Sequence, residues 1–275
     1  MQVQDLLKHT DKLPNVPDVV RELIVLLNDP NANYFDISKK VAHDQTMSLK
    51  VLRVVNSAYF GLSRKVYSID EATVILGLNK LKTLVIASGF ANSVKSVEGI
   101  DLKEFWRDSF RVALLAQWLG KRTDAVDAEE AFTAGIVHNL GRLLLHLTEP
   151  NIAQEIQVLV KTQYISRTKA EMDKLTFTTQ DASKALMDLW KFPPELGEAV
   201  RLHKRPFSEE NPQPLACILN LACYLNACIR DERDEMLVVD GFPKTVSKAA
   251  GLPEKIIYEL GEALLLEDDL DQLLA

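Results

Sequence analysis

The chain has 275 residues, of which 47% are hydrophobic and 26% charged, with 11 glycines and 11 prolines. This composition is typical of soluble globular proteins and excludes a largely disordered chain, while the length allows one large domain or two smaller ones. The net charge of -7 gives no global positive field for a phosphate backbone, so we expect no nucleic-acid partner.

No segment approaches the roughly 18 consecutive apolar residues that a membrane span needs, and the N-terminus lacks a basic region followed by an apolar run. We therefore expect no membrane contact and a cytoplasmic location. The three cysteines, Cys217, Cys223 and Cys228, lie in one predicted helix without a Cys-x-x-Cys pair. This spacing favours reduced thiols over a disulfide framework.

Apolar residues recur at intervals of three and four along almost the whole chain, and alternation with period two is missing. The pattern predicts an all-α protein. Ser68 and Glu71 have the spacing of a capping box, and Asp101 and Asp127 each stand where a helix start is expected. The predicted helices cover about residues 14–28, 35–42, 47–55, 68–77, 78–90, 101–119, 127–138, 140–147, 152–160, 178–190, 195–203, 215–229 and 254–266.

The polar, small-residue stretch at 93–99 is a candidate connection between two halves of the protein. We place a domain boundary there and expect two helical lobes. The N-terminal lobe would cover residues 1–96 and the second lobe residues 97–230, with C-terminal helices in 231–275 packed on the second lobe.

The stretch from Ala134 to Leu143 contains the pair His138-Asn139 in apolar sequence, followed by Gly141 and Arg142. A His-Asp pair would offer an imidazole and a carboxylate to one divalent ion, whereas His-Asn offers an imidazole and a neutral amide. His9, His43 and His146 have no partners at metal-ligand spacing. The pair therefore resembles a metal-site signature that lacks its carboxylate.

Several motifs resemble HDOD domains in their order and spacing, over about residues 10–225. The motifs that carry the resemblance are Leu13-Pro14-Asn15-Val16-Pro17, Leu27-Asn28-Asp29-Pro30, Val55-Asn56-Ser57-Ala58-Tyr59-Phe60-Gly61, Ser68-Ile69-Asp70-Glu71-Ala72, Phe105-Trp106-Arg107-Asp108-Ser109 and the stretch from Ala134 to Arg142. HDOD domains are all-helical output modules of bacterial signal transduction, related to the HD superfamily of metal-dependent phosphohydrolases. The resemblance implies an N-terminal HDOD lobe and a degenerate HD-like helical lobe.

In catalytic HD relatives the metal ligands are a first His, the His-Asp pair and a later Asp, with further His residues in two-metal forms. Most of the corresponding residues differ in this chain. The first His corresponds to Asp108, and the His-Asp pair corresponds to His138 and Asn139. A later His corresponds to Thr179, or to Asp181 if the alignment slips. A further His-His pair corresponds to His203 and Lys204, and the last Asp to a position near Cys223.

The resemblance therefore implies a relic site without catalytic residues, metal or cofactor. In this interpretation His138 is a buried neutral imidazole bonded to Asp108, and Asn139 caps or bridges helices. His203 and Lys204 complement the dipole at a helix C-terminus. Arg142 is then a surface cation, with an anion contact as the alternative.

We expect a non-catalytic signalling module that contacts a kinase, a receiver or a cyclic-dinucleotide enzyme in trans. Asn56, Tyr59 and Phe60 form a candidate docking loop, although the two aromatics could instead plug the N-terminal lobe. Two alternatives stay open. One is a metal-dependent phosphohydrolase whose divalent metal is held by Asp108, His138 and His203, and the other is a nucleotide or anion sensor without turnover that uses His138, Arg142 and Lys204.

Overall fold

The computed structural model describes residues 1–8, 38–39, 41–42, 45–56, 62–77, 81, 96–190 and 192–266. The protein is all-α, as predicted. The described residues contain no β-strand, and their only β-pairing is an isolated bridge between Val97 and Ile100. None of the described helices is long and apolar enough to cross a membrane.

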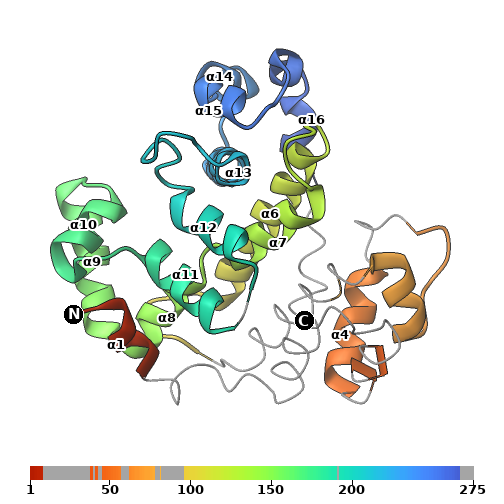
Figure 1. The fold of residues 1–275 in the computed structure, drawn as a ribbon, viewed down its shortest axis with the longest axis horizontal. Coiled ribbons are helices and arrows are strands. Elements are labelled where there is room, and N and C mark those ends of the chain that lie inside the picture. Colours follow the sequence, from red (N-terminus) through yellow and green to blue (C-terminus); the bar gives the residue numbers. More distant parts are fainter. Residues whose placement is uncertain are drawn as a thin grey trace.

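Among the described residues before position 96 are α1 (Val3–Lys8) and α4 (Gln45–Val55), and residues 38–39, 41–42, 69–77 and 81 are also helical. The following part of the chain folds into α6 (Leu102–Gly120), α7 (Ala128–Val137), α8 (Leu140–Thr148), α9 (Pro150–Gln163), α10 (Arg167–Leu175), α11 (Thr179–Leu189), α12 (Pro194–Leu202) and α13 (Pro214–Arg230). The last described elements are α14 (Glu235–Asp240), α15 (Lys244–Ala249), the 3₁₀ helix η2 (Glu254–Tyr258) and α16 (Leu260–Leu264). Figure 1 shows α1 beside α8 and α11, while α14 to α16 lie beyond α13.

Side-chain caps fix several helix starts where the sequence predicts them. Asp101 accepts hydrogen bonds from the second and third amides of α6, and Asp127 does the same for α7. Ser68 accepts the Glu71 N–H at 3.2 Å, but the Glu71 carboxylate accepts the N–H of Tyr67 instead of completing the capping box. The expected box at residue 68 is therefore only half formed.

Some elements differ from the prediction. The sequence pattern gave no sign of α1 or α10, and the single helix expected at 254–266 is divided into η2 and α16. The predicted helix at 14–28 lies outside the described residues, as does most of the one at 78–90. The division into lobes at residues 96 and 230 stays a prediction.

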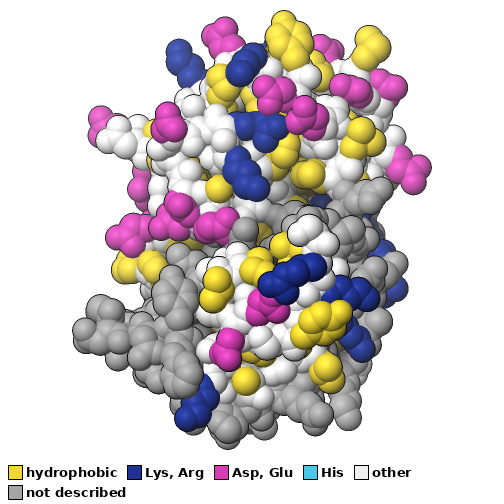
Figure 2. All heavy atoms as spheres, turned by 90° about the vertical axis from the view of Figure 1, so that its right-hand side faces the viewer, with side chains coloured by type: hydrophobic (Ala, Val, Ile, Leu, Met, Phe, Trp, Pro, Cys, Tyr) yellow, Lys and Arg dark blue, Asp and Glu magenta, His cyan; other side chains and the backbone are white. Residues whose placement is uncertain are grey.

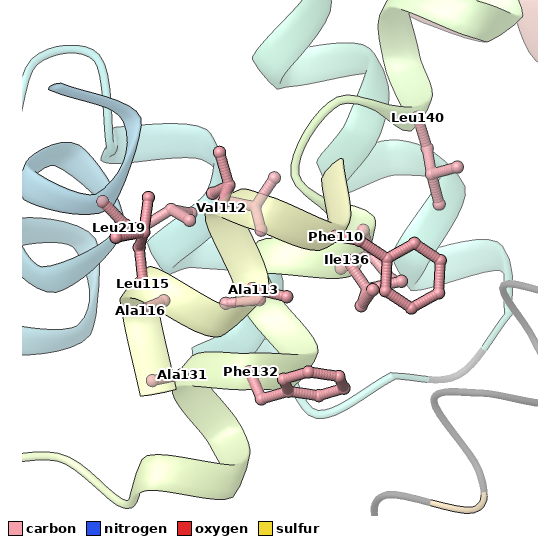
Figure 3. Close-up of a cluster of buried hydrophobic side chains, with 14 of the residues drawn as sticks. Phe110, Val112, Ala113, Leu115, Ala116, Ala131, Phe132, Ile136, Leu140 and Leu219 are labelled. Atoms are coloured by element: carbon pink, nitrogen blue, oxygen red, sulfur yellow. The ribbon is translucent and has the colours of Figure 1, made fainter. Parts of the chain in front are cut away.

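The core is centred on α6, which packs against α7 and α13. Figure 3 shows side chains from these helices and from α8 meeting in one apolar cluster, including Phe110, Ile136, Leu140 and Leu219. The approach of α6 and α7 is very close, because a Cβ added to Gly135 would lie 2.3 Å from the Cα of Ala113. Only a residue without a side chain fits there.

Candidate functional site

His138 and Asn139 lie at a joint between two helices. His138 is the C-cap residue of α7, and Asn139, at φ -107° and ψ 8°, occupies the N-cap position of α8. The expected capping role of Asn139 is only positional, since its side chain makes no capping hydrogen bond. The joint therefore depends on contacts made by its neighbours.

Gly141 and Ser183 hold this joint against α11. The Gly141 N–H donates to the Ser183 hydroxyl at 2.8 Å, and that hydroxyl donates to the His138 carbonyl at 3.1 Å. A Cβ on Gly141 would lie 2.0 Å from the Thr179 carbonyl oxygen. The small residue after the His-Asn pair is thus required by helix packing.

His138 and His203 occupy equivalent places at the ends of two helices. Each follows the last residue of its helix, α7 or α12, and each Nδ1 bonds a carbonyl three residues earlier, Gly135 at 2.6 Å and Val200 at 2.7 Å. The two rings are perpendicular, with centroids 5.6 Å apart. Because a carbonyl can only accept, both Nδ1 atoms are donors.

Cys223 of α13 completes this cluster. Cys223 is a half-buried residue, and its thiol interacts with both imidazoles. Burial raises the pKa of Cys223, but the charge of Lys204 and the interactions with His138 and His203 together hold that pKa well below its usual range. Four of the predicted site residues therefore meet: His138, His203, Lys204 and Cys223.

His203 contributes a hydrogen bond rather than a charge at the end of α12. Its side chain is fully buried, and burial lowers the pKa of His203 below its ordinary value, so the ring is neutral near pH 7. The predicted charge interaction of His203 with the helix dipole is accordingly replaced by the bond to Val200. Lys204 is exposed at the same helix end.

Asp108 bonds to α13 instead of to His138. Its carboxylate accepts from the Asn226 amide at 3.3 Å and lies 3.7 Å from a guanidinium nitrogen of Arg230. The bond to Asp108 that we expected for His138 is taken by the Gly135 carbonyl. Asp108 and the His138 cluster are thus held by different contacts.

Thr179 belongs to a third group, in which the buried carboxylate of Glu171 is the centre. Glu171 accepts from the Thr179 N–H and hydroxyl, both at 2.9 Å, and from Arg167 Nε at 3.0 Å. Arg142 lies near this group: burial, followed by the charge of Arg167, lowers the pKa of Arg142. The expected surface cation is therefore a partly buried one.

The donor set does not fit the metal centre of the HD superfamily. Of the ligands considered, Asp108 is engaged by α13, while His138 and His203 share their cluster with a thiol and the cation of Lys204. No three His, Cys, Asp or Glu side chains of the described residues come together in a way that could hold a metal ion.

Asn56 closes the loop that carries the predicted docking residues. Its amide group donates to the Leu52 carbonyl at 2.8 Å and to the Val66 carbonyl at 2.7 Å, and it accepts the Val66 N–H at 2.7 Å. Asn56 therefore has a positioning role. Tyr59 and Phe60 lie outside the described residues.

Sequence reasoning missed Arg167, Glu171, His146 and Ser183. Arg167 and Glu171 have the four-residue spacing of a helical ion pair, which was a usable signal. His146, on α8, donates from Nδ1 to the Glu98 carbonyl at 2.9 Å, a contact across 48 positions that no local pattern reveals.

The sequence model of the HDOD domain family matches residues 13–206. The chain belongs to the HDOD family. Among curated proteins, an uncharacterized protein of Treponema pallidum is 23% identical over 222 residues, covering 80% of this chain and 42% of its own. YuxH of Bacillus subtilis is 27% identical over 136 residues, 49% of this chain and 32% of its own. The HDOD chain thus spans less than half the length of either curated relative.

Solved structures share the HDOD fold over nearly the whole chain. A Shewanella amazonensis protein called "Putative phosphohydrolase" is 31% identical, with a TM-score of 0.81 and 98% of both chains covered. An HDOD domain protein of Geobacter sulfurreducens is 19% identical, with a TM-score of 0.77, and the match covers 98% of this chain and 96% of that one. The similarity to the Geobacter sulfurreducens protein shows a shared fold only.

Proposed function

We propose that this HDOD protein is a signalling module that acts by binding other proteins and does not turn over a substrate. The observation that carries the proposal is that the His138-Asn139 joint has a structural role in helix packing. Gly135 and Gly141 admit neighbouring helices, Ser183 bridges the joint, and His138 bonds its own helix. These residues stabilise the helical scaffold, and that scaffold would present the surface that binds other proteins.

Two exposed side chains that follow the predicted docking residues in the sequence support a protein-binding surface. Tyr67 is 79% exposed and Val74 is 81% exposed, and we call this pair the N-terminal surface. Figure 2 shows the side of the molecule that carries α4 and the helical residues 69–77, where apolar side chains reach solvent. Exposed aromatic and apolar groups are typical of the centres of protein interfaces. A kinase, a receiver or a cyclic-dinucleotide enzyme is the expected class of partner.

The test compares capture of partners by two matched double variants. Tyr67→Ser with Val74→Ser removes the N-terminal surface, whereas Tyr258→Ser with Met236→Ser removes two side chains that are 84% and 81% exposed on the C-terminal helices. Partners retained by the wild type are identified by mass spectrometry, and their affinity is then measured with purified proteins. We expect about a tenfold or greater loss of affinity in the first variant, equivalent to about 1.4 kcal/mol, and none in the second.

Retention of no signalling protein by the wild type would contradict the proposal. Equal binding by both variants would contradict the assignment of the surface. A loss confined to the Tyr258 and Met236 variant would place the interface on the C-terminal helices instead.

A metal-dependent phosphohydrolase is the second candidate, favoured by the 31% identity to the Shewanella amazonensis protein. It requires a divalent metal on rebuilt ligands, for which Asp108, His138 and His203 were the candidates. Elemental analysis of protein purified without chelator, combined with a phosphodiesterase assay, separates the two functions. Stoichiometric metal and phosphodiesterase activity, both lost in His138→Ala, would establish the enzyme. A metal-free and inactive protein would instead support the protein-binding module.

A further inference from the structure

Three buried nitrogen atoms in one part of the second half of the chain have no hydrogen-bond partner. They are Nε of Arg142, Nε2 of His146 and a terminal nitrogen, Nη2, of Arg167. Buried polar atoms almost always have a partner in native proteins, and an exception calls for an explanation such as a bound ion. Three exceptions on cationic or protonatable side chains point to a ligand of negative charge.

Helix packing brings together the segments that carry these side chains, and the charges of Arg142 and Arg167 act on His146. Arg142 and His146 are four residues apart on α8 and therefore share a face. Arg167 bonds Glu171, Glu171 bonds Thr179, and the Thr179 carbonyl lies against Gly141, the residue before Arg142. Figure 1 shows α8, α10 and α11 in the same part of the molecule.

The nearby carboxylates do not provide the missing partners. Glu171 already accepts from Thr179 and Arg167, and Asp108 accepts from Asn226. Glu104 and these two carboxylates favour the charged form of Arg142, but burial and the charge of Arg167 outweigh them and lower its pKa. Nε of Arg142 therefore has no hydrogen-bond partner in the protein, although three carboxylates lie near enough to act on its charge.

His146 also lacks a hydrogen-bond partner, at Nε2. Its side chain is 3% exposed. Burial lowers the pKa of His146, and the charges of Arg142 and Arg167 lower it further, against the opposing effect of its bond to the Glu98 carbonyl. An anion between these groups would reduce the repulsion among them and accept hydrogen bonds from the unpaired N–H groups of the two arginines.

We propose that Arg142, His146 and Arg167 bind a small oxyanion, either free inorganic phosphate or the phosphate group of a small phosphomonoester. Guanidinium groups match the geometry and charge of phosphate oxygens. His146 already donates from Nδ1 to Glu98, so a second proton, on Nε2, would be donated to the anion. The site uses neither the His138 cluster nor the N-terminal surface and is independent of the proposed function.

Thermal unfolding in phosphate, in AMP and in sodium chloride at matched ionic strength tests the site. We expect the Tm to rise with phosphate concentration beyond the chloride control, because a ligand of the native state stabilises it. A response to phosphate and AMP assigns a phosphomonoester, and a response to phosphate alone assigns the free ion. Equal Tm values in phosphate, AMP and chloride overturn the proposal.

Arg142→Leu gives a signature that a merely structural arginine would not give. The variant should lose the phosphate response, yet its Tm in chloride should not fall below that of the wild type, because the buried Nε of Arg142 has no hydrogen bond to lose and an unsatisfied buried donor is costly. Arg205→Leu, at an exposed position, is the matched control and should keep the response. A phosphate response that persists in Arg142→Leu, or is lost in Arg205→Leu, contradicts the site.

Sulfate binding between pH 8 and pH 6 tests the part of His146, because the charge of sulfate is constant in this range. Uptake of one proton on binding should strengthen the affinity as the pH falls, by at most about tenfold per pH unit. The charged groups that act on His146 are Arg142 and Arg167, and neither titrates here. His146→Gln should remove the pH dependence, and an unchanged pH dependence in that variant contradicts the assignment.

Discussion

At the scale of single residues, the small side chains around the His138-Asn139 pair are explained by distances between helices. Gly135 lets α7 approach α6, and Gly141 lets α8 approach α11, so each glycine stands where a methyl group would overlap a backbone atom. These requirements hold whether or not the pair binds anything. Helix packing alone therefore accounts for the small residues on both sides of the pair.

Gly141→Ala should destabilise the protein strongly, by about 3 kcal/mol or more, because the added Cβ would lie 2.0 Å from the Thr179 carbonyl oxygen and 2.5 Å from Ser183 N. Chemical denaturation of the variant measures the loss. The control is Gly197→Ala on α12, whose Cβ would meet nothing closer than Lys184 Cγ at 3.5 Å. This second change should be neutral or stabilising by about 0.5–1 kcal/mol. Similar effects of the two changes would contradict the packing argument.

The buried imidazole of His146 should make stability depend on pH. Its pKa is lowered in the folded protein, so below an ordinary pKa of about 6.5 the unfolded chain binds more protons than the native state. The free energy of unfolding should consequently be largest above pH 6.5 and decrease as the pH falls towards 5.5. In chloride buffer without phosphate or sulfate, denaturation curves of His146→Gln should show a smaller decrease than those of the wild type, and an equal decrease would assign the effect to other groups.

At the scale of elements, one carboxylate joins α10 to α11. Glu171 is 1% exposed and accepts two hydrogen bonds from Thr179, the first residue of α11, and one from Arg167 on its own helix. A carboxylate at a helix N-terminus is stabilised by the amides there. Thr179, which the family resemblance placed at a lost ligand position, is therefore used to fasten two helices.

Glu171→Ala should lower the free energy of unfolding by about 3 kcal/mol, because it leaves the buried N–H and hydroxyl of Thr179 without an acceptor. Urea denaturation of the variant measures this cost. Glu155→Ala serves as the comparison, since the ion pair of Glu155 with Lys174 is between side chains that are 57% and 39% exposed. Loss of the exposed Glu155–Lys174 pair should lower the free energy of unfolding by less than about 1 kcal/mol. A comparable decrease in both variants would mean that Glu171 acts only as a surface charge.

At the scale of the whole molecule, the sequence predicted what local chemistry determines. Helix periodicity and the caps at Asp101 and Asp127 gave the all-α class and most helices after residue 100, because these signals act within one turn. The grouping of site residues was less predictable, since it depends on which helix faces meet. Asp108 and His138 occupy related motif positions, yet Asn226 and Gly135 hold them separately.

The C-terminal helices illustrate a long-range contact of this kind. Arg122, just beyond α6, bonds Glu259 at 2.7 Å and Glu262 at 2.8 Å, and its guanidinium lies 3.6 Å above the ring of Trp118. Thr123 adds a hydrogen bond to the Ala250 carbonyl at 3.1 Å. Most of the connection between residues 122–123 and the last helices is thus polar and partly exposed.

Arg122→Leu should release the C-terminal helices locally without unfolding the core. The network combines partly exposed ion pairs with a cation–π contact and is worth about 1–2 kcal/mol, which is enough to increase local opening several-fold. Hydrogen exchange followed by mass spectrometry should show faster exchange in peptides covering residues 254–264, while α6 and α7 keep their wild-type rates. Lys121→Leu, at the exposed neighbouring position, should leave both regions unchanged. Faster exchange throughout the protein would instead show that Arg122 supports the central core, whose helices would then open together with the C-terminal segment.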